Sequence, residues 1–310
     1  MDALSTLLQQ TQYLTKTQFF TLKTAGNWAY SITNKNMMYF YLVQSGSFCI
    51  KIGDVLRVAY AGDIIMIPNA NKHICHARGH HGDNAKSLDK NISNYDQGTI
   101  NFTKSSVLDT QLILIECQYD EDLFRPLILA LPLILPEHED MDISQFQAIG
   151  RAVSFMALEF EFNRLGRLAM INEWASIVMI ECLRTYIEGL PETADNWLTV
   201  MIDPHLSKAL RVMHESPNIS WTTRDLAKEA GMSRSGFTQR FKDIVGIPPL
   251  TYLTDYRLRI AARRLRLQRS SIAQIGEMVG YSSHSTFSQA FKRVYEMSPS
   301  EYRKQQKDRN

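Results

Sequence analysis

Two stretches of this chain repeat one pattern: TTRDLAKEAGMSRSGFTQRFKDIVG, Thr222–Gly246, and SSIAQIGEMVGYSSHSTFSQAFKRVYE, Ser270–Glu296. In each, a short helical pattern ends at a glycine turn, and a second helix begins with small polar residues. Thr222 and Ser233 are suited to cap the two helices of the first copy. Two helices joined by such a turn predict a helix-turn-helix unit. We therefore expect a C-terminal all-α domain with helix-turn-helix units at 222–246 and 270–295, joined by a linker helix over 249–267.

The second helix of each copy has a buried aromatic face and an exposed polar face. Phe237 and Phe241 have the spacing of an inward-facing stripe, and Phe287 and Phe291 repeat it. Short and amide side chains on the opposite face let a helix approach base edges in the major groove, where glutamine can bond adenine bidentately. The predicted base-reading residues are Ser235, Gly236, Thr238, Gln239, His284, Ser285, Ser288 and Gln289.

Charge is unevenly distributed along the chain. Residues 200–310 hold 19 of the 34 Lys and Arg and 10 of the 32 Asp and Glu, giving +9 there and −7 in the remainder. A basic segment on an acidic chain is expected where only one part meets phosphates. The predicted phosphate contacts are Arg234, Arg240, Lys242, Lys292 and Arg293, with linker-helix arginines. A helical bundle with coincidental repeats and a DNA-coating protein are the alternatives; the varied, non-basic faces argue against coating.

The N-terminal half has a different pattern. Residues 26–67 contain short apolar and aromatic runs separated by glycines, which predict an antiparallel sandwich or barrel. A polar stretch over 77–106 predicts a long loop, and 111–119 one further strand. Residues 142–159 and 168–187 predict helices. The second helix is apolar on more than one face, which favours a homodimer contact, with packing on its own domain as the alternative.

Residues 204–303 resemble the DNA-binding domain of the AraC/XylS family of bacterial transcription regulators. The family's linker-helix pattern is met by Pro249-Leu250-Thr251-Tyr252 and Arg257-Leu258, and its tail pattern by Ser298-Pro299-Ser300-Glu301-Tyr302-Arg303. Glu296-Met297 stand where a glycine is usual, and Gly276 where alanine is usual. The resemblance implies two recognition helices in adjacent major grooves, about 34 Å apart, so that one monomer reads two half-boxes.

The stretch GDIIMIPNANKH, Gly62–His73, with the LALPLIL segment and the helices that follow, resembles the cupin-type domain found in front of some members of that family. The implied fold is α+β, with an N-terminal cupin-like β-barrel plus helices. We expect a sensor domain over 1–138, a helical dimerisation and linker region over 139–192, and the DNA-binding domain over 200–306.

A metal-dependent cupin enzyme with a basic accessory domain is the alternative function. Such a metal site needs about three histidines and a carboxylate, and residues 26–60 contain no histidine. We therefore expect no enzyme, no metal and no cofactor, and a hydrogen-bonded structural role for His73. An effector pocket lined by Trp28, Tyr39, Tyr41 and His73 and plain core packing of these aromatics are equally open.

Cys75 and Cys117 are candidates for oxidant sensing, which requires an exposed, low-pKa thiolate; buried, inert thiols are the default expectation. The four cysteines form no CxxC, and no stretch predicts a signal peptide or membrane span, so we expect reduced thiols in a cytoplasmic protein. The sequence predicts a DNA-binding transcription regulator that responds to a small molecule or oxidant. Its expected partners are double-stranded DNA, the effector, a second copy of the chain and, for an activator, RNA polymerase.

Overall fold

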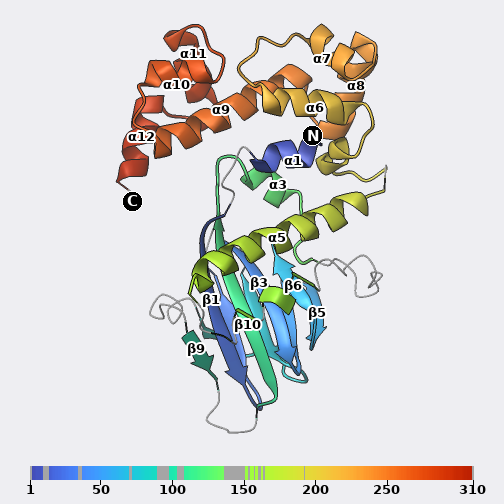
Figure 1. The fold of residues 1–310 in the computed structure, drawn as a ribbon, viewed down its shortest axis with the longest axis vertical. Helices are drawn as coiled ribbons and strands as arrows, with labels where there is room; N and C mark the ends of the chain where they lie inside the picture. Colours follow the sequence, from blue (N-terminus) through green and yellow to red (C-terminus); the bar gives the residue numbers. More distant parts are fainter. Residues whose placement is uncertain are drawn as a thin grey trace. The chain divides into compact units, whose positions relative to one another are not determined.

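The computed structural model describes residues 2–9, 14–33, 37–69, 72–88, 98–102, 108–135, 165–191 and 193–308, together with 151–152, 154–156, 158–159 and 162. The chain forms two compact units (Figure 1). The helical unit joins Met1–Tyr13, Asp120–Ala130 and Leu190–Asn310, and the β unit joins Leu14–Tyr119 and Leu131–Gly189.

The β unit contains two five-stranded sheets, ordered β6-β3-β10-β1-β9 and β5-β4-β7-β2-β8. Neighbouring strands pair antiparallel, except β1 with β9 and β2 with β8, which are parallel. The strands are β1 (Leu14–Thr24), β2 (Ala29–Ile32), β3 (Met37–Ser45), β4 (Ser47–Ile52), β5 (Val55–Tyr60), β6 (Ile64–Ile67), β7 (His73–Ala77), β8 (Lys86–Ser87), β9 (Gly98–Asn101) and β10 (Thr110–Tyr119).

The core of this unit lies between the sheets. Phe20 and Tyr41 from one sheet and Tyr30 and Phe48 from the other belong to a single buried cluster. Gly46 carries the chain from one sheet to the other. It has φ +77°, and an added Cβ would lie 2.0 Å from the carbonyl oxygen of Asp109. The expected cupin-like fold is confirmed, in the form of two facing sheets rather than one closed barrel.

The expected helix over 168–187 is α5 (Arg167–Glu188), which packs on β1. It buries Ile171, Val178 and Leu183, and the Arg167 guanidinium lies over the Phe19 ring, 4.8 Å from its centroid. The expected helix over 142–159 lies largely outside the described residues. In the described part of the chain, no helix has the length and apolarity needed to cross a membrane.

The helical unit is built around the linker helix α9, with α6–α8 toward one end and α10–α12 toward the other (Figure 1). Its elements are α1 (Ala3–Gln9), α3 (Arg125–Leu129), the 3₁₀-helix η2 (Trp197–Met201), α6 (Leu206–Glu215), α7 (Thr223–Glu229), α8 (Arg234–Val245), α9 (Pro249–Leu267), α10 (Ile272–Met278), α11 (His284–Tyr295) and α12 (Pro299–Lys307). The α+β fold and both helix-turn-helix units are therefore as the sequence predicts.

Candidate nucleic-acid interface

Each helix-turn-helix unit is ordered by its caps and its aromatic stripe. The Thr222 hydroxyl accepts from the Asp225 amide, and the Asp225 carboxylate accepts from the Thr222 amide, which forms a capping box on α7. Ser271 and Gln274 form the same box on α10, in the second unit. Phe237, Phe241, Phe287 and Phe291 are fully buried. These contacts fix which faces of α8 and α11 remain outside.

On α8, the predicted base-reading residues lie over the first two turns. Ser235 and Gln239 are exposed, while Gly236 and Thr238 are half-buried. The Thr238 hydroxyl donates to the Arg234 carbonyl, 2.8 Å away, and the Gln239 amide donates to the Asp243 carboxylate, 2.7 Å away. Asp243 thus holds the Gln239 amide group on the outer face of the helix.

On α11, His284, Ser285 and Gln289 are exposed and Ser288 is half-buried. The helix begins at His284, and the Ser283 hydroxyl caps it by accepting from the Thr286 amide. The predicted residues therefore occupy the opening turns of both second helices, on the side opposite the buried phenylalanines. In a helix-turn-helix protein, the N-terminal residues of the second helix contact base edges.

Four of the predicted phosphate-binding residues, Arg234, Lys242, Lys292 and Arg293, are exposed. Arg240 has a partner inside the protein, because its Nε and Nη2 atoms donate to Asp203 Oδ2 at 2.8 and 2.6 Å. The Asp203 side chain is only 4% exposed, whereas that of Arg240 is 50% exposed. This pair ties α8 to the start of α6.

Asp203 also caps α6, and this explains why its carboxylate is buried. Burial alone would raise the pKa of Asp203, but hydrogen bonds from the Leu206 amide, Arg240 and the His205 amide lower it below its ordinary value. Pro204 and His205 follow Asp203, and α6 begins at Leu206.

The two helix-turn-helix units contact each other through the loop between α6 and α7. Arg257 on α9 donates from Nε to the Pro217 carbonyl at 2.5 Å and from Nη2 to the Ile219 carbonyl at 2.7 Å. Gly280, in the turn of the second unit, packs against the same loop, since an added Cβ would lie 2.7 Å from the Asn218 carbonyl oxygen. Arg257 and Gly280 thus fix the first unit against the second.

The sequence predicts Arg257 on the linker helix and Gly280 in a turn, but it does not indicate the loop at 217–219 that both residues contact. The positive φ of Gly280, +88°, was foreseeable from its turn position. The approach of the Asn218 backbone was not, because no local pattern links residue 218 to residue 280.

The interior of the helical unit contains one buried histidine between α6 and α9. His214 is 0% exposed, and its Nε2 lies 2.7 Å from the Tyr252 hydroxyl. Burial, with the nearby charge of Arg259, lowers the pKa of His214 from its ordinary 6.5 to about 3. The imidazole is therefore neutral at physiological pH.

In the β unit, the residues predicted for an effector pocket come together in the core. Tyr41 and His73 are hydrogen-bonded, with the hydroxyl 2.6 Å from Nε2, as expected for a structural histidine. The Tyr39 ring packs edge-on against His73, and its hydroxyl donates to Glu116 at 3.0 Å. Trp28 stacks on Tyr30 at 5.6 Å between centroids.

The candidate redox cysteines are enclosed. Cys75 and Cys117 are both 0% exposed, and burial raises the pKa of each thiol to about 12. Both side chains are therefore protonated at neutral pH, unlike the accessible thiolate that oxidant sensing uses. Among the described residues, no cluster of three or more His, Cys, Asp or Glu side chains could hold a metal ion.

Taken together, two capped recognition helices with polar outer faces, carried on a basic helical unit, define a helix-turn-helix DNA-binding protein. Family comparisons agree, since residues 226–305 match the helix-turn-helix domain model and residues 2–188 match the cupin model. The chain belongs to the AraC family of helix-turn-helix transcription regulators, with a cupin N-terminal domain, and it is itself a DNA-binding transcription regulator.

Two relatives match nearly the whole chain, and a solved structure matches about a third of it. The HTH-type transcriptional regulator AlkR of Acinetobacter baylyi is 33% identical, covering 98% of this chain and 100% of that one. The regulator MtrA of Neisseria gonorrhoeae is 27% identical over 98% of this chain and 99% of its own. A solved AraC-type regulator structure from Chromobacterium violaceum is 33% identical, covering 33% of this chain and 92% of that one, with a TM-score of 0.31.

Proposed function

We propose that the helical unit reads two half-boxes of an operator and that the β unit senses a small molecule that controls this reading. The observation that carries the proposal is the exposed polar face on the opening turns of both α8 and α11. Residues 1–138 would act as the sensor, 139–192 as the dimerisation and linker region, and 200–306 as the DNA reader.

Base reading is assigned to the outer faces of α8 and α11. Gln239 and Gln289 are exposed, and each can offer an amide to an adenine edge. Operator duplexes are first selected from a random pool with the wild-type chain. We expect Gln239→Ala and Gln289→Ala to relax preference at particular base positions.

Lys242→Ala serves as the matched phosphate variant, because Lys242 is exposed on the same helix as Gln239. This change should weaken binding to all sequences alike and lower the salt slope by about 1. If the glutamine variants also weaken every duplex equally, the reading face is misassigned.

Effector sensing is assigned to the core around Tyr41 and His73. The Tyr30 hydroxyl is fully buried in the same cluster beside Cys75 and Tyr41, and it makes no hydrogen bond of regular geometry among the described residues. Aromatic rings beside such a hydroxyl favour an apolar or aromatic molecule with one hydrogen-bonding group. The buried, protonated thiols of Cys75 and Cys117 favour this class of effector over an oxidant.

A thermal-shift screen of apolar and aromatic metabolites against the full chain tests this assignment, since a ligand of the folded state raises the melting temperature. Tyr30→Phe should reduce the shift given by a hit. A hit whose shift is unchanged in Tyr30→Phe would place the effector elsewhere.

We further propose a homodimer that uses the outer face of α5. Leu168, Met170 and Ile177 are 51%, 42% and 40% exposed, although other residues of α5 pack on the β unit. Ile177→Glu should yield monomers by light scattering, whereas Ser176→Glu, at the neighbouring position, should not. In this proposal the dimer acts in the cytoplasm and, as an activator, recruits RNA polymerase, which run-off transcription from a selected operator would test.

A further inference from the structure

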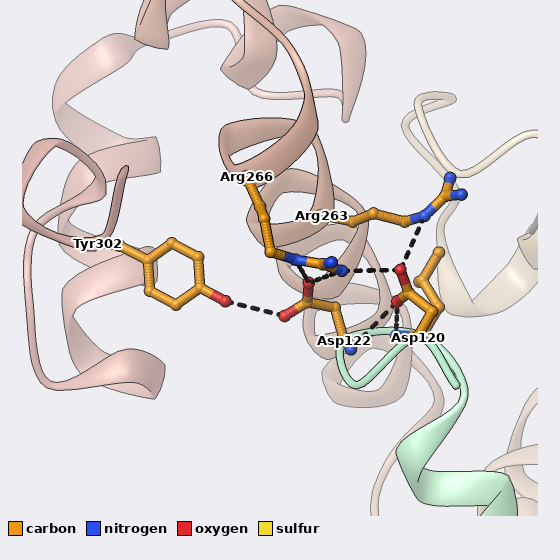
Figure 2. Close-up of polar contacts among 6 residues, drawn as sticks. Asp120, Asp122, Arg263, Arg266 and Tyr302 are labelled. Carbon is orange, nitrogen blue, oxygen red and sulfur yellow. Dashed lines mark hydrogen bonds and ion pairs between the residues drawn. The ribbon is translucent and has the colours of Figure 1, made fainter. Parts of the chain in front are cut away.

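The turn that follows β10 binds the linker helix through its carboxylates (Figure 2). Asp120 Oδ2 accepts from Arg263 Nε at 3.1 Å and from Arg266 Nη2 at 2.7 Å. Asp122 Oδ2 accepts from the same Arg266 Nη2 at 2.9 Å, and Asp122 Oδ1 accepts from the Tyr302 hydroxyl at 2.9 Å. One short turn therefore joins the end of α9 to α12.

These carboxylates are buried, unlike those of an ordinary surface ion pair. The Asp120 and Asp122 side chains are 0% and 7% exposed, and those of Arg263 and Arg266 are 23% and 21% exposed. Asp120 Oδ1 also accepts from the Asp122 and Leu123 amides, each at 3.1 Å, which shapes the turn before it meets α9.

The rest of the segment 120–130 is anchored in the same unit. Phe124, Leu127 and Ile128 are buried, and the Asn196 side chain donates to the Ala130 carbonyl at 2.8 Å. Segment 120–130 thus belongs to the helical unit, although it lies in sequence between two parts of the β unit.

A charged contact of this kind holds one specific arrangement. Buried carboxylates are tolerated only when well paired, so a turn displaced from its arginines would leave buried charge unpaired at a high cost in free energy. By contrast, the first helix-turn-helix unit is held by Asp203 and by the loop at Pro217–Ile219, all within 190–310. The carboxylates of segment 120–130 bond α9 and α12, whereas its Ala130 carbonyl accepts from Asn196, the N-cap of η2, which packs on α8.

We propose that the Asp120–Asp122 turn is a latch through which strand β10 positions the second helix-turn-helix unit. Asp120 directly follows Tyr119, the last residue of β10. Four residues before Asp120, Glu116 accepts the hydroxyl of Tyr39, an effector-pocket candidate. A ligand that moves Tyr39 would move β10, and through it the carboxylates that hold Arg266 and Tyr302; this step rests on the proposed sensing role of the β unit.

The latch itself is tested without DNA or ligand, by hydrogen exchange on the full chain. In Asp120→Asn/Asp122→Asn, amides of α12 should exchange at least about tenfold faster, since a broken buried pair leaves uncompensated charge. Amides of α8 should be unaffected. Tyr302→Phe leaves no charged group unpaired, so it should speed α12 exchange by a smaller factor. This variant still tests the latch if the double variant does not fold.

Glu215→Gln is the matched control, because it breaks the ion pair of Glu215 with Arg211 on α6, whose side chains are 31% and 34% exposed. It should leave α12 exchange unchanged. Equal acceleration of α8 and α12 in the latch variants, or none in either, would overturn the proposal.

Coupling is tested by reciprocity, because linked sites affect each other equally. In the wild-type chain, binding of a selected duplex should alter exchange in β10, and this response should disappear in Tyr302→Phe or in the double variant. The latch is refuted as a signal path if DNA binding leaves β10 exchange unchanged in the wild-type chain. It is also refuted if the change in β10 exchange persists in both variants. If no duplex is selected, the DNA-reading proposal fails, while the DNA-free arm still decides whether the latch exists.

Discussion

Gly280→Ala offers a sharp test of how the two helix-turn-helix units are joined. Gly280 has φ +88°, and the added methyl group would lie 2.7 Å from the Asn218 carbonyl oxygen and 2.9 Å from its Cα atom. Both are backbone atoms, so no side chain can rotate away to make room. Gly231 occupies the equivalent turn of the first unit with φ +66°, and its nearest neighbour would be 4.0 Å away.

Substitution of either glycine costs free energy because of its positive φ, but only Gly280 would also bring the new methyl group against the Asn218 backbone. Alanine in the left-handed region costs about 1–2 kcal/mol at either position. Gly280→Ala adds the overpacking against Asn218, typically about 1–3 kcal/mol. We therefore expect Gly280→Ala to lower the free energy of unfolding by about 1–3 kcal/mol more than Gly231→Ala.

Thermal or urea unfolding of the two full-length variants measures this difference directly. For a unit of this size, each kcal/mol lowers the melting temperature by about 2–4 °C. Gly280→Ala should also weaken binding to a two-box operator more than Gly231→Ala does. Equal destabilisation of the two variants would show that the Asn218 contact does not join the units as described.

Three further changes address other contacts of the helical unit. His214 has a folded pKa of about 3 against 6.5 when unfolded, so the unfolded chain takes up the proton first as pH falls. Stability is full above pH 6.5 and should drop by about 2 kcal/mol at pH 5, measured by urea midpoints, and His214→Gln should flatten this drop. Arg240→Ala should lower stability by about 1 kcal/mol, because it strands the buried Asp203 carboxylate while Arg240 itself is half exposed. A lysine at position 257 cannot donate to two carbonyls at once as the Arg257 guanidinium does. The wild-type chain should bind an operator of normal box spacing more tightly than one with lengthened spacing, and Arg257→Lys should reduce this affinity ratio by at least about threefold.

Each of these expectations has a contrary outcome. A His214→Gln variant with the wild-type pH profile would assign the acid sensitivity to other groups. If Arg240→Ala keeps full stability but lowers the salt dependence of DNA binding, Arg240 contacts phosphate instead of stabilising the fold. Unchanged spacing preference in Arg257→Lys would show that the loop at 217–219 does not set the distance between the recognition helices.

Most of the fold is predictable from local features of the sequence. The caps at Thr222 and Ser233, the repeated phenylalanines and the linker helix over 249–267 are all set by neighbours a few residues away, and all of them appear in the structure. The apolar runs predicted the strands of β3, β4 and β10 for the same reason. Alternation and spacing are properties that a sequence displays directly.

Contacts between distant segments were not foreseeable. Asp120 and Asp122 follow a strand and read as an ordinary acidic turn, and Arg266 reads as part of a basic helix face. Their pairing spans more than 140 residues, and no periodicity records it. Arg240 likewise has the composition of a phosphate ligand, and only the structure shows its bond to Asp203. The strands β8 and β9 arise in a polar stretch whose composition predicts a loop.

The composition of the helical unit bears on how such regulators can be recombined. Because α1 and the segment 120–130 belong with residues 190–310, the helical unit is assembled from three separate pieces of chain. Leu7 and Leu8 of α1 are buried, and α1 packs on α6. A chimera cut only at residue 190 would therefore leave apolar surface uncovered and two arginines unpaired. An exchange of β units between relatives would therefore have to keep these three pieces of the helical unit together.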